Sequence, residues 1–216
     1  MKSFLTAWLF ATATLVALAT SGICLASASK APVILVYGDS LSAEYGLPRG
    51  AGWVALMEQR LKQLKIDYSV ANASISGETT AGGAARINTE LARIQPAIVI
   101  IELGGNDGLR GLALAATRAN LESMIEAASK AGARVLLCGM QLPPNYGRDF
   151  TERFRAMYGE LANRHKVAML PFFLDGIGER RELFQSDGIH PVAEAQPRIL
   201  DNVWVRLVPL LKAPRK

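Results

Sequence analysis

Short apolar runs and longer amphipathic segments alternate along the chain from Val33 onward. The apolar runs are too short for buried helices, and runs of this kind are typical of strands buried on both faces of a sheet. They cover residues 33–37, 68–71, 97–103, 135–139 and 167–172. Apolar side chains at helical spacing mark the segments between and after them, at residues 53–64, 80–94, 112–130, 150–165 and 191–211.

This alternation predicts an α/β fold, because parallel strands need a crossover connection, which a helix usually supplies. Right-handed crossovers then place helices on both faces of the sheet. We therefore expect a three-layer α/β/α sandwich of flavodoxin-like type, with a five-stranded parallel sheet. Half of the 216 residues are hydrophobic, which suits one domain with a substantial core. No repeat or linker interrupts the pattern, and residues 29–216 are predicted to form this single domain.

The first segment of the chain is expected to lie outside the domain. Lys2 is followed by an uncharged run over residues 3–29, and Ala26-Ser27-Ala28 has the small-x-small pattern of signal-peptidase cleavage. Residues 1–28 are therefore predicted to be a signal peptide, which implies an exported protein, periplasmic or secreted. An uncleaved membrane anchor is the alternative, because the run is long enough to span a bilayer. After cleavage we expect no stable membrane insertion.

Charge and cysteine content exclude several classes of protein. The net charge is +5, but the Lys and Arg residues form no dense block, which argues against a nucleic-acid partner. No Cys/His cluster has metal-ligand spacing, so we expect no metal site. Cleavage would remove Cys24 and leave Cys138, whose place in an apolar run predicts a buried thiol and no internal disulfide.

Ser40 follows the first predicted strand, directly after the turn pair Gly38-Asp39. In open parallel sheets, ligands bind outside the carboxyl ends of the strands. Ser40 is therefore placed as a nucleophile would be. A serine that caps the next helix is an equally good interpretation of this stretch alone.

Two further loops at the same edge contain unusual residues. Gly77 follows the second strand, and a glycine lets a backbone N–H approach a ligand closely. Gly104-Gly105-Asn106-Asp107 follows the third strand, where Asn106 can direct its amide at the edge. Plain turns for the glycines and a helix cap for Asn106 are the alternatives. The convergence of these loops on Ser40 favours a functional site.

A serine nucleophile needs a general base, and the chain has only two histidines, His165 and His190. His165 lies in a basic segment at a predicted helix end, where a structural role is preferred. His190 has Asp187 three residues before it, close enough for the carboxylate to accept the imidazole Nδ1–H and fix its tautomer. A surface Asp–His pair in a turn is the alternative.

With these residues in place, the sequence resembles the SGNH hydrolase superfamily, also called the GDSL esterases and lipases. Within it the chain is most similar to the bacterial periplasmic group of multifunctional thioesterase I, arylesterase and lysophospholipase enzymes. The four blocks that carry the resemblance occur in order: Gly38-Asp39-Ser40-Leu41-Ser42, Gly77, Gly104-Gly105-Asn106-Asp107 and Asp187-Gly188-Ile189-His190-Pro191. Glu78 is a departure, since aspartate is more usual after that glycine.

The resemblance implies roles for particular residues. Ser40 would be the nucleophile, His190 the general base and acid, and Asp187 the group that orients His190. The oxyanion hole would consist of the backbone N–H groups of Ser40 and Gly77 and the side-chain amide of Asn106. The family uses no cofactor, and we expect a monomer.

The resemblance also implies an acyl ester or thioester as substrate, with lysophospholipids among the candidates. Export favours lipid esters over cytosolic acyl-CoA. Apolar residues of the edge loops are the predicted lining of an acyl groove: Ile75, Leu109, Leu142, Tyr146 and Phe150. A carbohydrate or small-ester deacetylase of the same superfamily is the alternative enzyme.

An exported small-ligand-binding α/β module is the alternative from a different class, because doubly wound folds bind nucleotides at the same edge. The chain contains neither Gly-x-Gly-x-x-Gly after the first strand nor a Walker A sequence. The enzyme is therefore the preferred interpretation.

Overall fold

The strands of the computed structural model form one parallel sheet in the order β2-β1-β3-β4-β5. The structure describes residues 31–213, so the predicted signal peptide lies outside the described residues. The strands are β1 (Val33–Gly38), β2 (Ser69–Asn72), β3 (Ile98–Glu102), β4 (Arg134–Cys138) and β5 (Ala168–Leu170).

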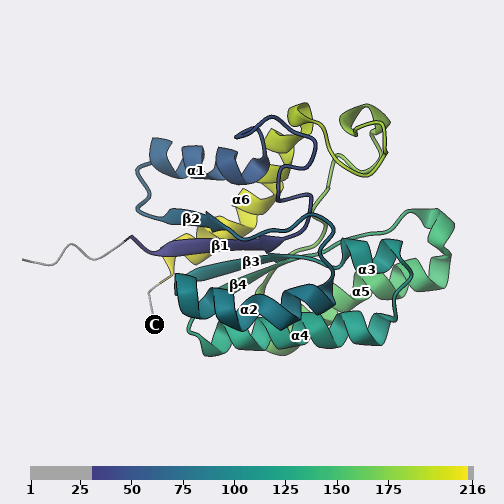
Figure 1. The fold of residues 1–216 in the computed structure, drawn as a ribbon, viewed down its shortest axis with the longest axis horizontal. Coiled ribbons are helices and arrows are strands. Elements are labelled where there is room, and N and C mark those ends of the chain that lie inside the picture. Colours follow the sequence, from purple (N-terminus) through teal and green to yellow (C-terminus); the bar gives the residue numbers. More distant parts are fainter. Residues whose placement is uncertain (1–30, 214–216) are drawn as a thin grey trace, which may run out of the picture. The chain divides into compact units, whose positions relative to one another are not determined.

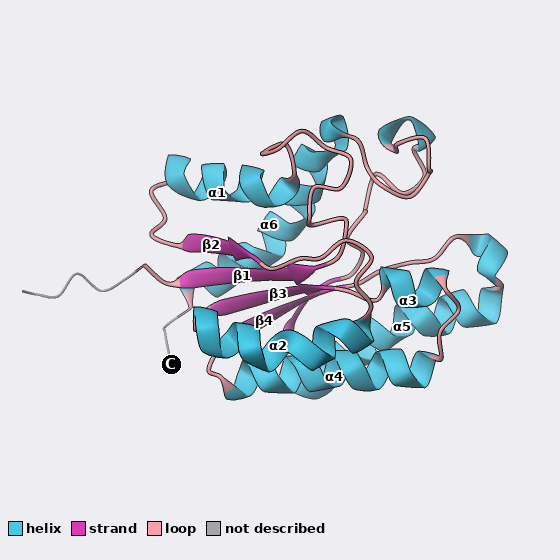
Figure 2. Cartoon of the chain, in the orientation of Figure 1, coloured by secondary structure: helices cyan, strands magenta, loops and turns pink. Residues whose placement is uncertain are grey.

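Helices cover both faces of this sheet (Figures 1 and 2). Helices α1 and α6 pack together on one face, while α2, α4 and α5 lie on the other. Their bounds are α1 (Trp53–Gln63), α2 (Thr80–Ile94), α4 (Leu114–Lys130), α5 (Arg148–His165) and α6 (Gln196–Lys212). The predicted α/β/α sandwich with a five-stranded parallel sheet is therefore confirmed.

Burial explains why the interior strands β1, β3 and β4 consist largely of apolar residues. All five residues of β3 and most of β1 are fully buried, because helices cover both of their faces. In α4, the buried residues Leu121, Met124, Ile125 and Ala128 recur at intervals of three or four, which gives one apolar face. Gly132, with φ of 82°, follows the C-cap of this helix and permits the left-handed turn that ends it.

Several boundaries differ from the prediction by one or two residues, and the start of the last helix differs by five. The last helix begins at Gln196 and not at Pro191, because Pro191 pairs with Phe184 in an isolated antiparallel bridge. The last strand ends at Leu170, before Pro171, which has no N–H to donate to a ladder.

Several short helices occur in segments that were predicted to be loops. The five-residue helix α3 (Gly105–Leu109) occupies the glycine-rich segment after β3. Two 3-10 helices, Pro144–Tyr146 and Arg181–Leu183, also lie in such segments. A third, Ala193–Ala195, lies in the first part of the predicted last helix.

Cys138 lies at the end of β4 and is fully buried, as predicted. Burial raises the pKa of its thiol well above the usual range, so the unreactive thiol form persists. No helix among residues 31–213 is both long and apolar enough to cross a bilayer.

Candidate active site

The turn that carries Ser40 begins where β1 ends. The carbonyl of Asp39 accepts the N–H groups of Ser42 at 3.2 Å and Ala43 at 3.0 Å. The Asp39 side chain accepts the N–H of Leu41 at 3.0 Å, which closes the turn on its other side. Ser40 is thereby held partly buried at the carboxyl edge of the sheet.

Gly38 is required for this arrangement by close packing. A Cβ at that position would lie 2.5 Å from Glu102 Oε2, on the neighbouring strand β3. The buried carboxyl of Glu102 occupies this space and accepts the hydroxyl hydrogen of Ser42 at 2.6 Å. The turn is therefore supported from beneath by a side chain that only a glycine can accommodate.

His190 bonds to Ser40 and to Asp187 at the same time. Its Nε2 lies 2.8 Å from Ser40 Oγ, and its Nδ1 lies 2.7 Å from Asp187 Oδ2. The carboxylate selects the tautomer with hydrogen on Nδ1, so Nε2 is free to accept the serine hydroxyl proton. The ring also packs against Tyr45 at a tilt of 37°, with 4.3 Å between ring centroids.

Asp187 is fixed by its own turn. Its Oδ1 accepts the backbone N–H groups of Ile189 at 2.9 Å and His190 at 3.0 Å. Partial burial acts to raise the pKa of Asp187, but the hydrogen bonds from the His190 ring and from these two N–H groups outweigh it and hold the pKa at about 2. The carboxylate is therefore ionised at any physiological pH.

His165 does not reach this site. It ends α5, and its Nε2 lies 2.9 Å from Glu122 on α4. Glu122, Glu126 and His165 place donor atoms within 4.8 Å of one another, but the Glu122 carboxylate is already bonded to both His165 and Arg164. The structure thus brings His190, and not His165, to Ser40.

Asn106 and Gly77 lie beside Ser40 in the same cavity. The Nδ2 of Asn106 is 3.0 Å from Asp39 Oδ2 and 3.0 Å from the carbonyl oxygen of Glu78. Asn106 is not a helix cap, because the N-cap of α3 is Gly104. Both N–H groups of this amide already have an acceptor. To donate to an oxyanion, one of them must leave its acceptor or divide its hydrogen bond between that acceptor and the oxyanion.

Gly77 adopts φ of 79°, a conformation that favours glycine. Its carbonyl accepts a hydrogen bond from Arg110 Nη2 at 3.1 Å, which fixes the orientation of the loop after β2.

The cavity around these residues has a volume of about 1170 Å³. Of the five predicted lining residues, Leu109 and Leu142 line it, whereas Ile75, Tyr146 and Phe150 are not among its lining residues. Tyr146 donates its hydroxyl to the carbonyl of Leu109, and Phe150 packs beside Phe154. Apolar residues that the sequence did not single out complete the wall: Met140, Phe172, Leu174, Ile177 and Phe184.

Residues 36–196 match the model of the GDSL-like Lipase/Acylhydrolase family. The chain belongs to this family. Esterase TesA of Pseudomonas aeruginosa is 53% identical over 189 residues, which cover 88% of this chain and 94% of that relative. The Escherichia coli (strain K12) protein named thioesterase 1/protease 1/lysophospholipase L1 is 42% identical over 184 residues, which cover 85% of this chain and 87% of the relative.

A solved structure has the same fold. The psychrotrophic esterase EstA from Pseudoalteromonas sp., inhibited by monoethylphosphonate, matches with a TM-score of 0.80 and 35% identity. The match covers 84% of this chain and 99% of that one. The predicted family resemblance is confirmed.

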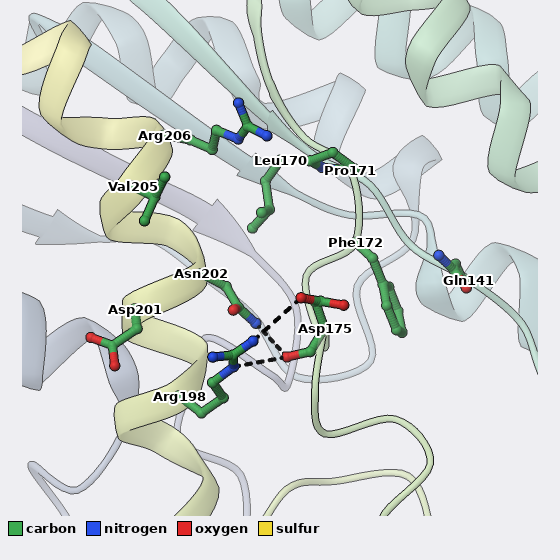
Figure 3. A pocket seen from close by; sticks show the side chains of 10 residues that line it. All are labelled: Gln141, Leu170, Pro171, Phe172, Asp175, Arg198, Asp201, Asn202, Val205 and Arg206. Atoms are coloured by element: carbon green, nitrogen blue, oxygen red, sulfur yellow. Dashed lines mark hydrogen bonds and ion pairs between the residues drawn. The ribbon is translucent and has the colours of Figure 1, made fainter.

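A second cavity of about 520 Å³ lies beside α6 in this GDSL-like domain (Figure 3). Arg198 and Asn202 extend from the helix toward Asp175, and both donate to its backbone carbonyl. This cavity shares Gln141, Phe172 and Asp175 with the larger one, but its lining includes neither Ser40 nor His190. The larger cavity is therefore the candidate active site.

Two buried carboxyl groups, those of Asp39 and Glu102, support the turn that carries Ser40. Burial raises the pKa of Asp39 to about 6, against the lowering effects of the Leu41 N–H, Asn106 and His190. Burial, and then the nearby charge of Asp39, raise the pKa of Glu102 well above its usual range. Sequence reasoning missed Glu102, although one acidic residue at the end of an otherwise apolar strand is a signal of a constrained site.

The unfolding free energy of the Glu102→Gln variant is expected to increase relative to that of the wild type as the pH rises. The folded wild type retains the Glu102 proton above pH about 4.3, where the unfolded chain releases it, so the contribution of Glu102 to the unfolding free energy falls with rising pH. Glutamine has the shape of the protonated acid and carries no such proton. Denaturant titrations at pH 4 and pH 9 measure the two unfolding free energies. If the unfolding free energies of the variant and the wild type differ by the same amount at both pH values, Glu102 is not held protonated in the folded wild type.

Proposed function

We propose that this chain is an exported serine hydrolase that cleaves esters and thioesters of acyl chains through an acyl-enzyme on Ser40. The enzyme class itself, a carboxylic ester hydrolase, is confirmed by the family match and by relatives named as esterase and as thioesterase/lysophospholipase. The residue roles, the substrate and the export of this chain are the proposal. The observation that carries it is the continuous hydrogen-bonded line from Ser40 through His190 to Asp187.

This line supports a two-step reaction. Ser40 Oγ attacks the carbonyl carbon and gives its proton to His190 Nε2, while Asp187 stabilises the imidazolium. His190 then protonates the leaving alcohol or thiol, and the acyl group remains on Ser40. A water molecule attacks the acyl-enzyme, passes a proton to His190 and releases the acid, after which His190 returns the proton to Ser40.

The negative oxygen of each tetrahedral intermediate needs donors. The backbone N–H groups of Ser40 and Gly77 and the amide of Asn106 are the proposed ones, because all three residues line the cavity. Asp39 and Glu78 would hold the amide of Asn106 through its present hydrogen bonds. These two residues would thus orient a donor without contacting the substrate.

The cavity supports an acyl-chain substrate. Its volume of about 1170 Å³ is ample for a drug-sized or lipid-sized molecule, and many of its lining residues are apolar. The uncharged segment at residues 3–29, with its Ala26-Ser27-Ala28 pattern, supports export. Lipid esters are therefore the preferred natural substrates.

Chain-length dependence tests this proposal. With p-nitrophenyl esters from acetate to octanoate, kcat/KM is expected to rise, by up to about fourfold for each methylene that becomes buried. Leu142→Ala should make the increase of kcat/KM with chain length smaller, because Leu142 lines the cavity. The matched control is Leu64→Ala, at an exposed leucine outside the cavity, which should leave that increase as in the wild type. A kcat/KM that falls steadily from acetate to octanoate would indicate a deacetylase instead.

A further inference from the structure

Large apolar side chains that are exposed gather near the mouth of the cavity. Among the described residues, Tyr45, Ile75 and Ile189 are exposed to 50%, 49% and 46%. Tyr45 and Ile189 line the cavity directly. Ile75 donates its N–H to the carbonyl of Gly38, at the start of the Ser40 turn.

These three side chains, called the apolar rim below, come from three separate loops at the carboxyl edge of the sheet. Residues that follow Ile75, namely Ser76 and Gly77, also line the cavity. Isolated exposed apolar residues are ordinary on protein surfaces, but a group around a binding site indicates an interaction surface. The rim is continuous with the cavity in which we place an acyl chain.

A cation accompanies the apolar rim. Arg110 is exposed and donates to the carbonyl of Gly77, and no carboxylate of the described residues lies within ion-pair distance of it.

The carboxylates next to the three rim residues in the sequence have partners of their own. Glu44 accepts the N–H groups of Gly50 and Gly52, Glu78 pairs with Arg86, and Asp187 bonds to His190. The rim therefore presents apolar groups and an exposed guanidinium group that has no carboxylate partner among the described residues.

We propose that the apolar rim and Arg110 dock on a phospholipid surface. Arg110 would bind headgroup phosphates, since a guanidinium matches phosphate oxygens in geometry and charge. The rim side chains would enter the boundary between headgroups and acyl chains, where the amphipathic ring of Tyr45 is suited to lie. A lipid could then pass from the surface into the cavity with its acyl chain sheltered from water. This step rests on the proposed function, but docking itself requires no turnover.

Flotation with ether-linked vesicles tests the docking without hydrolysis, because such lipids contain no ester bond. The protein is purified after export, with its N-terminus determined, and mixed with vesicles of ether-linked phosphatidylglycerol and phosphatidylcholine. The double variant Ile75→Ser/Ile189→Ser is expected to bind the vesicles at least roughly tenfold more weakly than the wild type does. Arg110→Gln should weaken binding several-fold and make it less sensitive to salt.

The matched control is Leu64→Ser/Val205→Ser, which removes apolar residues exposed to 56% and 67% elsewhere on the domain. Leu64 precedes β2 and so lies at the opposite, amino edge of the sheet. This control should bind vesicles as the wild type does. Thermal denaturation checks that every variant is folded.

Three outcomes would overturn the proposal: no binding by the wild type, equal binding by the rim variant, or equal loss in the control. If light scattering instead shows a dimer that the rim variant dissociates, the rim is a self-association surface. Because the readout is binding alone, a failure of the proposed ester hydrolysis would appear separately, as absent turnover of soluble esters.

Discussion

Replacing His190 by glutamine is expected to reduce kcat/KM by roughly 10⁴- to 10⁶-fold, because removal of the base from a Ser-His-Asp unit costs about that much. Glutamine cannot accept the Ser40 proton and release it again at neutral pH. The variant should still fold, since His190 is only partly buried and lies in a loop.

The matched control is His165→Gln, at the only other histidine. His165 bonds to Glu122 on the surface of α4 and α5, so its loss should lower stability by about 1 kcal/mol at most and leave kcat/KM within about twofold. Steady-state kinetics with p-nitrophenyl butyrate measure both variants. Inactivation by His165→Gln, together with an active His190→Gln enzyme, would reverse the assignment of the base.

Asn106→Ala is expected to lower kcat by roughly 10²- to 10³-fold with KM nearly unchanged, the usual effect of removing one oxyanion donor. The negative charge appears on the carbonyl oxygen only as the tetrahedral intermediate forms, so the lost donor stabilised the transition state and not the bound substrate. Asn145→Ala is the matched control, because Asn145 is exposed on the 3-10 helix Pro144–Tyr146.

Asn106→Asp should be at least as damaging as Asn106→Ala. A carboxylate would repel the developing oxyanion, and it would also face Asp39 Oδ2 and the Glu78 carbonyl, which now accept from the amide. Single-turnover kinetics separate the acylation rate from binding, and circular dichroism shows whether the variant is folded. Near-normal kcat in a folded Asn106→Asp enzyme would remove Asn106 from the oxyanion hole.

Much of the fold could be predicted because its signals are local. The apolar run that became β3 is buried on both faces, and the periodic segment that became α2 has the predicted bounds. Placing Ser40 at the sheet edge required only the rule that ligands bind beyond the carboxyl ends of parallel strands. The Asp187–His190 contact followed from a spacing of one turn.

The parts that escaped prediction depend on tertiary contacts. Helix α3 is built from a glycine-rich segment, whose local preference is for a turn. Pro191 favours a helix start in sequence, but its bridge to Phe184 holds it extended. The cavity wall formed by Phe172, Leu174 and Ile177 comes from an irregular segment without periodicity. In loops, the direction of a side chain is set by its partners: Tyr146 donates its hydroxyl to the Leu109 carbonyl and is not among the lining residues of the cavity.

Labelling with a fluorophosphonate tests the central claim most directly, because this reagent forms a stable adduct with a serine that a neighbouring base activates. The folded enzyme should take up one equivalent of label, and peptide mass spectrometry should locate it on Ser40. Prior substitution of His190 by glutamine should slow the labelling strongly. An adduct on the buried Ser42 or on any other residue, or an unlabelled Ser40 in folded protein, would contradict Ser40 as the nucleophile.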